Sequence, residues 1–310
     1  MSVTTISTNG MCREEWIEHR RLGIGGSDAA AIIGLNPWVT PYTIWADKTG
    51  RLPEREDNEA MRQGRDLESY VAERFTEETG KKVRRKNAIL ISDEYPFMMA
   101  NIDREVVGED AGLECKTTSM MNLKKFKNGE YPENYYVQCM HYMAVTGYQR
   151  WYLAVLVLNQ GFYVFCIERD EDEIAALIKG EQDFWENYIV PDEAPPVDGM
   201  APTTAAINAL YPGGKGEVTL GGLETDLKNL CDVKNEIKIL EGLKEKYEQE
   251  IKEAMRDYEK ATCGDYTISW RSQSRSSFDA KAFAVEHPEM DLSRFYKTSE
   301  YRVFSVKGGK

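Results

Sequence analysis

Residues 101–117 read NIDREVVGEDAGLECKT, and this stretch decides the fold of the first part of the chain. Its middle, residues 108–112, is rich in glycine and acidic residues, a composition typical of a tight connection between strands. The flanking segments are apolar enough for strands. We therefore expect one strand over 97–107 and another over 112–117, joined as an antiparallel hairpin.

Charged side chains are expected to converge at one end of this hairpin. Glu114 and Lys116 lie two residues apart in a strand, so they face the same side, whereas Cys115 points into the core. The preceding strand brings Asp103 alongside them. Carboxylate oxygens suit Mg²⁺ or Mn²⁺, and a nearby lysine can orient a water or stabilise charge on a phosphoryl group. The alternative is a surface hairpin with a salt bridge between Glu114 and Lys116. The D…ExK pattern is short and often occurs by chance, so on its own it favours this alternative.

The sequence on both sides of the hairpin predicts a sheet covered by helices. The expected helices lie over 14–21, 42–49, 59–79, 135–146 and 171–188, and the further strands lie over 83–91, 151–158 and 162–167. This order of elements indicates an α/β or α+β domain over residues 1–190, with a central mixed sheet flanked by helices.

The sequence changes character after this domain. Residues 191–222 are rich in proline and glycine pairs and are expected to form a linker. Over 223–258, apolar residues recur at three- and four-residue steps, which predicts one long amphipathic helix, or two separated near Gly242. We expect residues 223–310 to form an accessory module of this helix and a small β-rich tail. The expected tail strands lie over 266–270 and 301–306.

Composition excludes several protein classes. The 310 residues contain no apolar run of the roughly 18 residues that a membrane span needs. The first thirty residues lack the apolar core of a signal peptide, so we expect a cytoplasmic location. The six cysteines form no CxxC pair and the chain has only three histidines, which argues against a zinc or iron–sulfur site. Because the net charge is −13, binding to DNA would require positive charge focused in a groove, helped by bound cations.

Two helices carry further polar residues at informative spacing. Glu68 lies on the apolar stripe of the helix over 59–79, where an unpaired acid is costly. A metal ion is one partner that could offset this cost, and Arg62 or Arg65 is the alternative. Gln138 and Tyr142 lie one helical turn apart, so they could bind DNA or the region of the lysine, or simply close an edge of the core.

A glycine-rich loop forms a second candidate site. Residues 23–26 read GIGG, with Arg20 and Arg21 before them and Ser27 at an expected helix start. Backbone N–H groups at a helix N-terminus, together with arginines, can bind an anion. A purely structural turn is the more frequent explanation of such a loop taken alone.

Taken in order, RRLGIGGSD, GRDLE, NID…LECK and QCMHY resemble the YqaJ-type phage recombination nucleases, which are related to lambda exonuclease within the PD-(D/E)XK nuclease fold. The resemblance covers roughly residues 13–190, and one departure is Asn101-Ile102 where the family name has a proline before the aspartate. The resemblance implies that the metal ligands are Glu68, Asp103, Glu114 and the carbonyl of Cys115. It implies that Lys116 is the catalytic lysine and that Gln138 and Tyr142 are the QxxxY pair. It also implies that Arg21 and Ser27 contact a DNA 5′-phosphate, with Arg20 as the alternative arginine.

The resemblance implies an Mg²⁺-dependent (or Mn²⁺-dependent) DNA exonuclease. Such an enzyme resects double-stranded DNA ends from 5′ to 3′ and leaves a 3′ single strand for a single-strand annealing protein. It also implies a ring-shaped homo-oligomer, for example a trimer, in a bacterial host or prophage. Two alternatives stay open from the sequence. One is a structure-specific or nicking endonuclease of the same fold, and the other is a non-catalytic DNA-binding or assembly protein.

Overall fold

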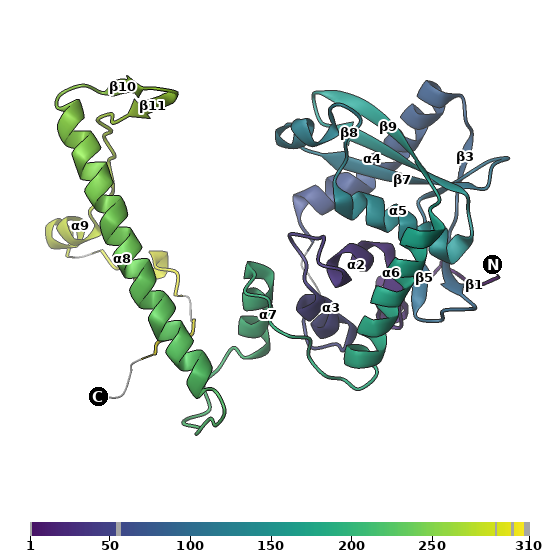
Figure 1. The fold of residues 1–310 in the computed structure, drawn as a ribbon, viewed down its shortest axis with the longest axis horizontal. Helices are drawn as coiled ribbons and strands as arrows, with labels where there is room; N and C mark the ends of the chain where they lie inside the picture. Colours follow the sequence, from purple (N-terminus) through teal and green to yellow (C-terminus); the bar gives the residue numbers. More distant parts are fainter. Residues whose placement is uncertain (1, 54–56, 289, 299–300, 307–310) are drawn as a thin grey trace. The chain divides into compact units, whose positions relative to one another are not determined.

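The computed structural model describes residues 2–53, 57–288, 290–298 and 301–306. The chain divides into two compact units, an N-terminal unit of residues 1–211 and a C-terminal unit of residues 212–310 (Figure 1). The predicted division into a nuclease domain over 1–190, a linker over 191–222 and an accessory module over 223–310 stays a prediction. The compact N-terminal unit nevertheless extends past residue 190, for a reason given below.

The N-terminal unit is built on a mixed sheet in the order β3-β6-β7-β8-β9. Strands β7 and β8 run parallel, whereas the other neighbours are antiparallel. The parallel pair needs a crossover, which a helix supplies. The strands are β3 (Val83–Arg85), β6 (Arg104–Val106), β7 (Ala111–Thr118), β8 (Arg150–Val157) and β9 (Gly161–Glu168).

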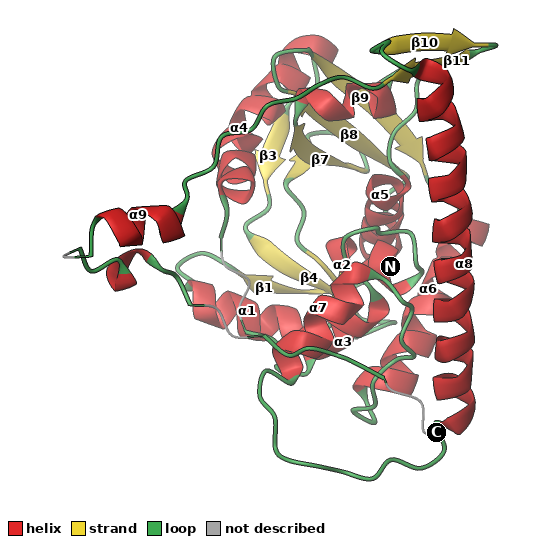
Figure 2. Cartoon of the chain, turned by 90° about the vertical axis from the view of Figure 1, so that its left-hand side faces the viewer, coloured by secondary structure: helices red, strands yellow, loops and turns green. Residues whose placement is uncertain are grey.

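Helices cover both faces of this sheet (Figure 2). Alternate residues of a strand point to opposite faces. Tyr152 and Ala154 of β8 therefore pack with Phe75 of helix α4 (Glu59–Thr79). Trp151 and its neighbours on the opposite face pack with the crossover helix α5 (Glu133–Thr146). The predicted central mixed sheet flanked by helices is confirmed.

A second sheet, in the order β1-β4-β5-β2, lies in the same unit. Its strands are β1 (Val3–Ser7), β2 (Ile24–Gly25), β4 (Ala88–Ser92) and β5 (Met98–Ala100). The predicted single strands over 83–91 and 97–107 are therefore wrong. Each breaks into two short strands, because β3 pairs with β6 in the first sheet while β4 pairs with β5 in the second. Residues 101–103, Asn-Ile-Asp, occupy the break where the chain passes from one sheet to the other.

Two of the remaining helices of this unit, α2 (Gly26–Ile32) and α6 (Glu171–Phe184), pack against α5. Helix α5 is buried along Val137–Val145, on all its sides, so it is a core helix rather than an amphipathic one. The other helices are α1 (Arg13–Arg21), α3 (Pro41–Lys48) and α7 (Ala201–Leu210), with short helical turns at Met120–Phe126 and Trp185–Ile189. Helix α7 lies in the segment expected to be a linker. Its Ala206 is buried beside residues of α3, so the compact unit ends at Tyr211 rather than at residue 190.

The C-terminal unit is dominated by one continuous helix, α8 (Glu224–Met255), which Gly242 does not interrupt. A hairpin of β10 (Lys260–Cys263) and β11 (Tyr266–Ser269) follows, then α9 (Ala280–Glu286) and a short turn at Ser293–Phe295. The predicted strand over 301–306 is wrong, because β11 pairs with β10 through a tight turn instead. None of the helices in the described part of the chain combines the length and apolarity needed to cross a membrane.

Candidate active site

The hairpin of β6 and β7 brings the predicted acidic residues together. Arg104 pairs with Leu113 in the antiparallel register, so the residue before β6 lies beside the middle of β7. As a result, the backbone N–H of Cys115 donates a hydrogen bond of 2.8 Å to Oδ2 of Asp103. One oxygen of Asp103 is thereby fixed against the neighbouring strand, next to Glu114.

Four side chains form a continuous polar network at this end of the sheet. Lys116 Nζ lies 2.6 Å from Glu114 Oε1 and donates a hydrogen bond of 2.9 Å to Oε1 of Gln138. Gln138 Nε2 in turn donates to Glu114 Oε1 at 2.7 Å and contacts the hydroxyl of Tyr142 at 2.9 Å. Strand β7 and helix α5 thus supply the two halves of one cluster, so Gln138 and Tyr142 lie in the region of the lysine, one of the alternatives left open by the sequence.

The electrostatics of this cluster suit a cation. Burial and the neighbouring charge of Glu114 raise the pKa of Asp103 well above its ordinary value. Burial alone would lower the pKa of Lys116, but the charge of Glu114 raises it overall. Glu114 Oε2 is buried and has no hydrogen-bond partner among the described residues. A buried carboxylate oxygen without a partner is costly, so a divalent cation would offset a real deficit at this point.

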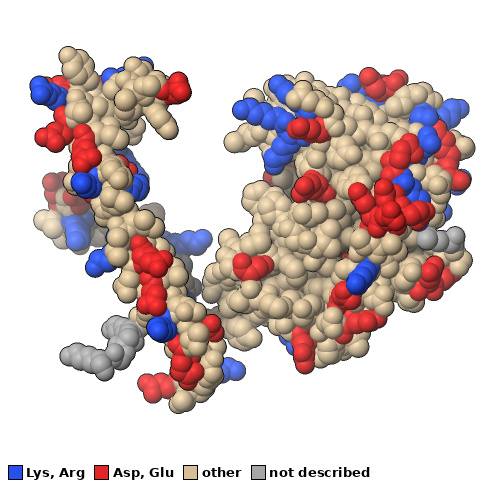
Figure 3. Space-filling model, viewed as in Figure 1, with Lys and Arg blue, Asp and Glu red and all other residues tan. Residues whose placement is uncertain are grey.

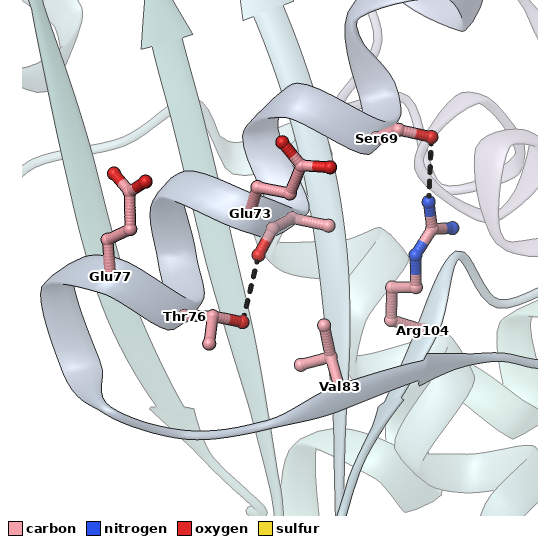
Figure 4. Close-up of a pocket in the computed structure, with 7 residues that line it drawn as sticks. Ser69, Glu73, Thr76, Glu77, Val83 and Arg104 are labelled. Carbon is pink, nitrogen blue, oxygen red and sulfur yellow. Dashed lines mark hydrogen bonds between the residues drawn. The ribbon is translucent and has the colours of Figure 1, made fainter.

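The third predicted acid, Glu68 on α4, is held by another partner. Its carboxylate forms a short ion pair with the buried guanidinium of Arg104. Arg104 also donates to the carbonyl oxygen of Asp103 at 2.7 Å and contacts Ser69 on α4 (Figure 4). Arg62 and Arg65, expected as alternative partners of Glu68, pair instead with Asp66 and Asp57. In the described part of the chain no three metal-binding side chains already converge, which agrees with this diversion of Glu68.

The glycine-rich loop forms the opposite wall of the site. Strand β2 ends at Gly25, whose N–H donates a hydrogen bond of 3.1 Å to Asp28 on α2. Arg20 Nη2 lies 3.2 Å from Ser27 Oγ and 3.1 Å from Asp28 Oδ1. Lys48 holds the other oxygen of Asp28 at 2.7 Å. Burial alone would raise the pKa of Asp28, but the charges of Lys48 and Arg20 lower it overall, so it remains a carboxylate that orients Arg20.

Of the two candidate arginines, Arg20 is the one in contact with Ser27. Arg21 lies one residue further along α1 and lines a neighbouring groove, but makes no hydrogen bond to Ser27. Arg20 also lies over the ring of Trp16, with 5.6 Å from Cζ to the ring centroid. The assignment of either arginine to a phosphate contact stays a prediction, and the geometry favours Arg20.

The two walls share one small pocket of about 190 Å³. Its lining includes Arg20 and Ser27 from the loop side, and Asp103, Glu114 and Gln138 from the carboxylate side. The walls can lie this close because Gly26 has no side chain. A Cβ on Gly26 would lie 2.6 Å from Tyr142 Cε1.

Several polar residues that support the site were not predicted from sequence. Arg104 holds Glu68, and Asp28 with Lys48 orients Arg20. Deeper in the core, His141 of α5 lies 2.8 Å from Glu181 and donates to the Met99 carbonyl at 2.8 Å. The usable signal was the presence of charged residues within segments that are otherwise apolar, since such residues need partners when buried.

The amino-acid sequence matches a known family and a curated relative. A family model described as the YqaJ-like viral recombinase domain matches residues 15–149. The uncharacterized protein YqaJ of Bacillus subtilis (strain 168) is 39% identical over 304 residues, covering 96% of this chain and 95% of that protein.

Two solved structures give weaker matches. The alkaline exonuclease LHK-Exo from Laribacter hongkongensis is 21% identical with a TM-score of 0.48, covering 57% of this chain and 93% of its own. A phage related exonuclease from Haemophilus somnus 129PT is 13% identical with a TM-score of 0.44, covering 57% of this chain and 100% of its own.

Proposed function

This chain belongs to the YqaJ-like viral recombinase family, and we propose that it is a divalent-metal-dependent DNA exonuclease that resects double-stranded ends from 5′ to 3′. The observation that carries the proposal is the pocket shared by two walls of opposite character. One wall has a buried, unpartnered oxygen of Glu114, and the other has Arg20 and Ser27. A phosphodiester beside a metal and a second phosphate beside an arginine would fit these two walls.

Asp103, Glu114 and the carbonyl of Cys115 would hold Mg²⁺ or Mn²⁺. Carboxylate and carbonyl oxygens are the ligands these ions prefer, and Mg²⁺ usually keeps several waters in addition. Glu68 would join them by exchanging its ion pair with Arg104 for the metal. The bound ion would activate a water and stabilise the negative charge that develops on the scissile phosphate.

Lys116 would position the attacking water and stabilise charge on the phosphoryl oxygens. Gln138 fixes the lysine beside Glu114, because its amide contacts both Lys116 and Glu114. Tyr142 braces Gln138 from one helical turn away. These three residues hold the reacting groups in place before the substrate arrives, which reduces the cost of ordering them during the reaction.

Arg20 and Ser27 would receive the 5′-terminal phosphate. The guanidinium and the hydroxyl lie together at the start of α2, and Asp28 fixes the arginine from behind. A terminal phosphate carries more negative charge than an internal one, so this wall would favour a 5′-phosphorylated end. Arg21 is the alternative contact.

Three assembly proposals accompany the activity. We propose that the enzyme forms a ring-shaped homo-oligomer around double-stranded DNA. We also propose that the 3′ strand it leaves is handed to a single-strand annealing protein in recombination. The C-terminal unit, residues 212–310, would serve as the accessory module for assembly or for recruiting that partner.

The test compares linear duplex DNA labelled at either 5′ or 3′ ends with closed circular DNA, each with and without Mg²⁺. The proposal expects digestion of linear DNA only, dependent on Mg²⁺, with early loss of the 5′ label. Digestion of closed circles would favour the endonuclease alternative. Binding to DNA without digestion under any divalent metal would favour the non-catalytic alternative.

A further inference from the structure

A second groove continues from the candidate active site along the surface of the N-terminal unit. It encloses about 470 Å³ and shares Trp16, Arg20 and Ser27 with the smaller catalytic pocket. At its far side it shares Trp38 and Leu52 with an apolar groove of about 740 Å³. The three connected grooves, which we call the surface track, therefore extend beyond the glycine-rich loop of residues 23–26.

The chemistry of this second groove suits a nucleic acid strand. Arg13, Arg20 and Arg21 line it, and the Nε donor of Arg21 is buried without a hydrogen-bond partner among the described residues. A buried donor without a partner is satisfied when an acceptor such as a phosphate oxygen arrives. Two carboxylates, Asp28 and Asp47, also line the groove.

Both carboxylates, Asp28 and Asp47, act on Arg20. Asp28 is already paired with Lys48 at 2.7 Å and with Arg20 at 3.1 Å. The charge of Asp28 raises the pKa of Arg20, and the charge of Asp47 adds to this effect. Arg21, whose buried Nε donor has no hydrogen-bond partner among the described residues, therefore remains as a charge presented to a ligand.

Trp38 stands at the junction between the arginine-lined and apolar parts of the track. Its side chain is 76% exposed, whereas Trp16 is partly buried and has Arg20 over its ring. The backbone N–H of Trp38 donates to Asn36 Oδ1 at 2.9 Å, which orders the turn that carries the ring. An indole held out in this way, beside arginines, has the arrangement on which nucleobases stack.

We propose that Trp38 is a stacking platform for an unpaired base of a DNA strand that runs past the phosphate-binding loop. The inference rests on the proposed nuclease function and adds a substrate class to it, namely duplex ends that carry a single-stranded overhang. The 5′-terminal phosphate at Ser27 marks the end of one strand, so the base at Trp38 belongs either to the unpaired 3′ strand or to a 5′ extension.

The experiment measures binding of the full-length protein to fluorescent duplexes with a blunt end, a 3′ overhang or a 5′ overhang. The parent protein carries Glu114→Gln, so that the DNA stays intact during the measurement. We expect one overhang polarity to bind more tightly than the blunt end. Trp38→Ala should weaken that binding by about 5- to 100-fold, and Trp38→Phe should restore most of it.

Two controls make the result specific to stacking. Trp270→Ala removes another exposed tryptophan, 47% accessible and outside the groove, and should leave every affinity unchanged. An abasic nucleotide at the position over the ring should weaken binding to the parent but not to Trp38→Ala. The polarity of the preferred overhang identifies which strand supplies the base.

The proposal is overturned if the parent shows no overhang preference, or if Trp38→Ala keeps it in full. In that case the exposed tryptophan and the apolar groove would be better explained by a protein partner. This outcome differs from failure of the nuclease function. That failure appears as absence of Mg²⁺-dependent digestion by the unmodified protein, whatever the overhang affinities are.

Discussion

The two units of the chain differ in how they use apolar residues. In the N-terminal unit, Trp151, Phe75 and Leu153 are completely buried. In the C-terminal unit, Met255 is the single buried residue among those described, and Leu240 in the middle of α8 is 63% exposed. Figure 3 shows α8 with charges of both signs separated by uncharged surface. A unit that buries its core can hold a polar catalytic network rigidly, whereas a unit that exposes apolar residues is suited to binding another surface.

The largest expected effect tests whether DNA digestion depends on the two carboxylates of the N-terminal unit. Asp103→Asn or Glu114→Gln should reduce the rate of duplex digestion by at least about 100-fold, because each removes charge that would hold the metal. Initial rates on end-labelled linear DNA measure this loss, and circular dichroism checks that the variants are folded. A variant that digests at the unmodified rate would show that its carboxylate is not part of the site.

Two glycines give a matched pair of substitutions across the units. Gly26→Ala should destabilise the protein by about 1–3 kcal/mol, since its Cβ would lie 2.6 Å from Tyr142. Gly242→Ala should instead stabilise α8 by up to about 1 kcal/mol, because nothing lies within 4 Å of its Cβ and glycine is a poor helix former.

Urea unfolding of both variants measures these opposite effects. Digestion by Gly26→Ala should fall along with stability, because the displaced tyrosine braces Gln138. If both substitutions were neutral, the close contact of α2 with α5 would not be a feature of the folded protein.

Next in size is a pH dependence that arises in the core of the N-terminal unit. Burial alone would lower the pKa of His141, but Glu181 raises it above 6.5. Burial raises the pKa of Glu181 above 4.5, against the effect of His141. Asp28 is the other charge that acts on both, and it too raises their pKa values.

Both groups therefore bind protons more tightly in the folded state, so their contribution to stability is lost as pH rises from 4.5 through 6.5 and beyond. The unfolding free energy of the unmodified protein, relative to a His141→Gln, Glu181→Gln double variant, should fall on the order of 1 kcal/mol between about pH 5 and pH 8. Denaturant titrations at several pH values measure it. A relative stability that rose with pH would mean that the buried pair has the opposite protonation.

The smallest expected effect concerns the C-terminal unit. A chain that ends at Gly222 keeps every predicted site residue, so its rate on short linear duplexes should stay within about twofold, well under 1 kcal/mol. Its solution mass or its binding to an annealing protein should change, because the apolar surface of α8 is gone. Digestion assays and light scattering measure the two properties. A folded but inactive truncation would show that the C-terminal unit contributes to catalysis.

The site was predictable where it depended on neighbours in sequence. Strand spacing placed Glu114 with Lys116, and helical spacing placed Gln138 with Tyr142, because these relations follow from backbone geometry alone. The pairing of Glu68 with Arg104 joins residues 36 positions apart, and local spacing carries no information about it. The resemblance to a family supplied roles for residues but left Arg20 and Arg21 unresolved.

The fold was predictable to a similar extent. The helix over 59–79 follows from its apolar periodicity and from Gly80, which ends it. The helix over 135–146 ends at Gly147, but its burial on all sides leaves it without a polar face. The split of two expected strands between two sheets was not predictable, since residues 83–91 and 97–107 each suggest one continuous strand. What separates them is the choice of pairing partners, which is a long-range property. The polar residues Asn101 and Asp103 were the local sign of this change.

The contact of Gly26 with Tyr142 has a consequence for the products of the reaction. With no side chain between them, α2 and α5 meet directly, so the phosphate-binding loop and the carboxylates cannot change their separation without disturbing the core. A terminal phosphate anchored at Ser27 would then always place the same phosphodiester at the metal. Every cleavage event would release a fragment of one constant length, and a broad mixture of fragment sizes would indicate that the DNA end is not anchored there.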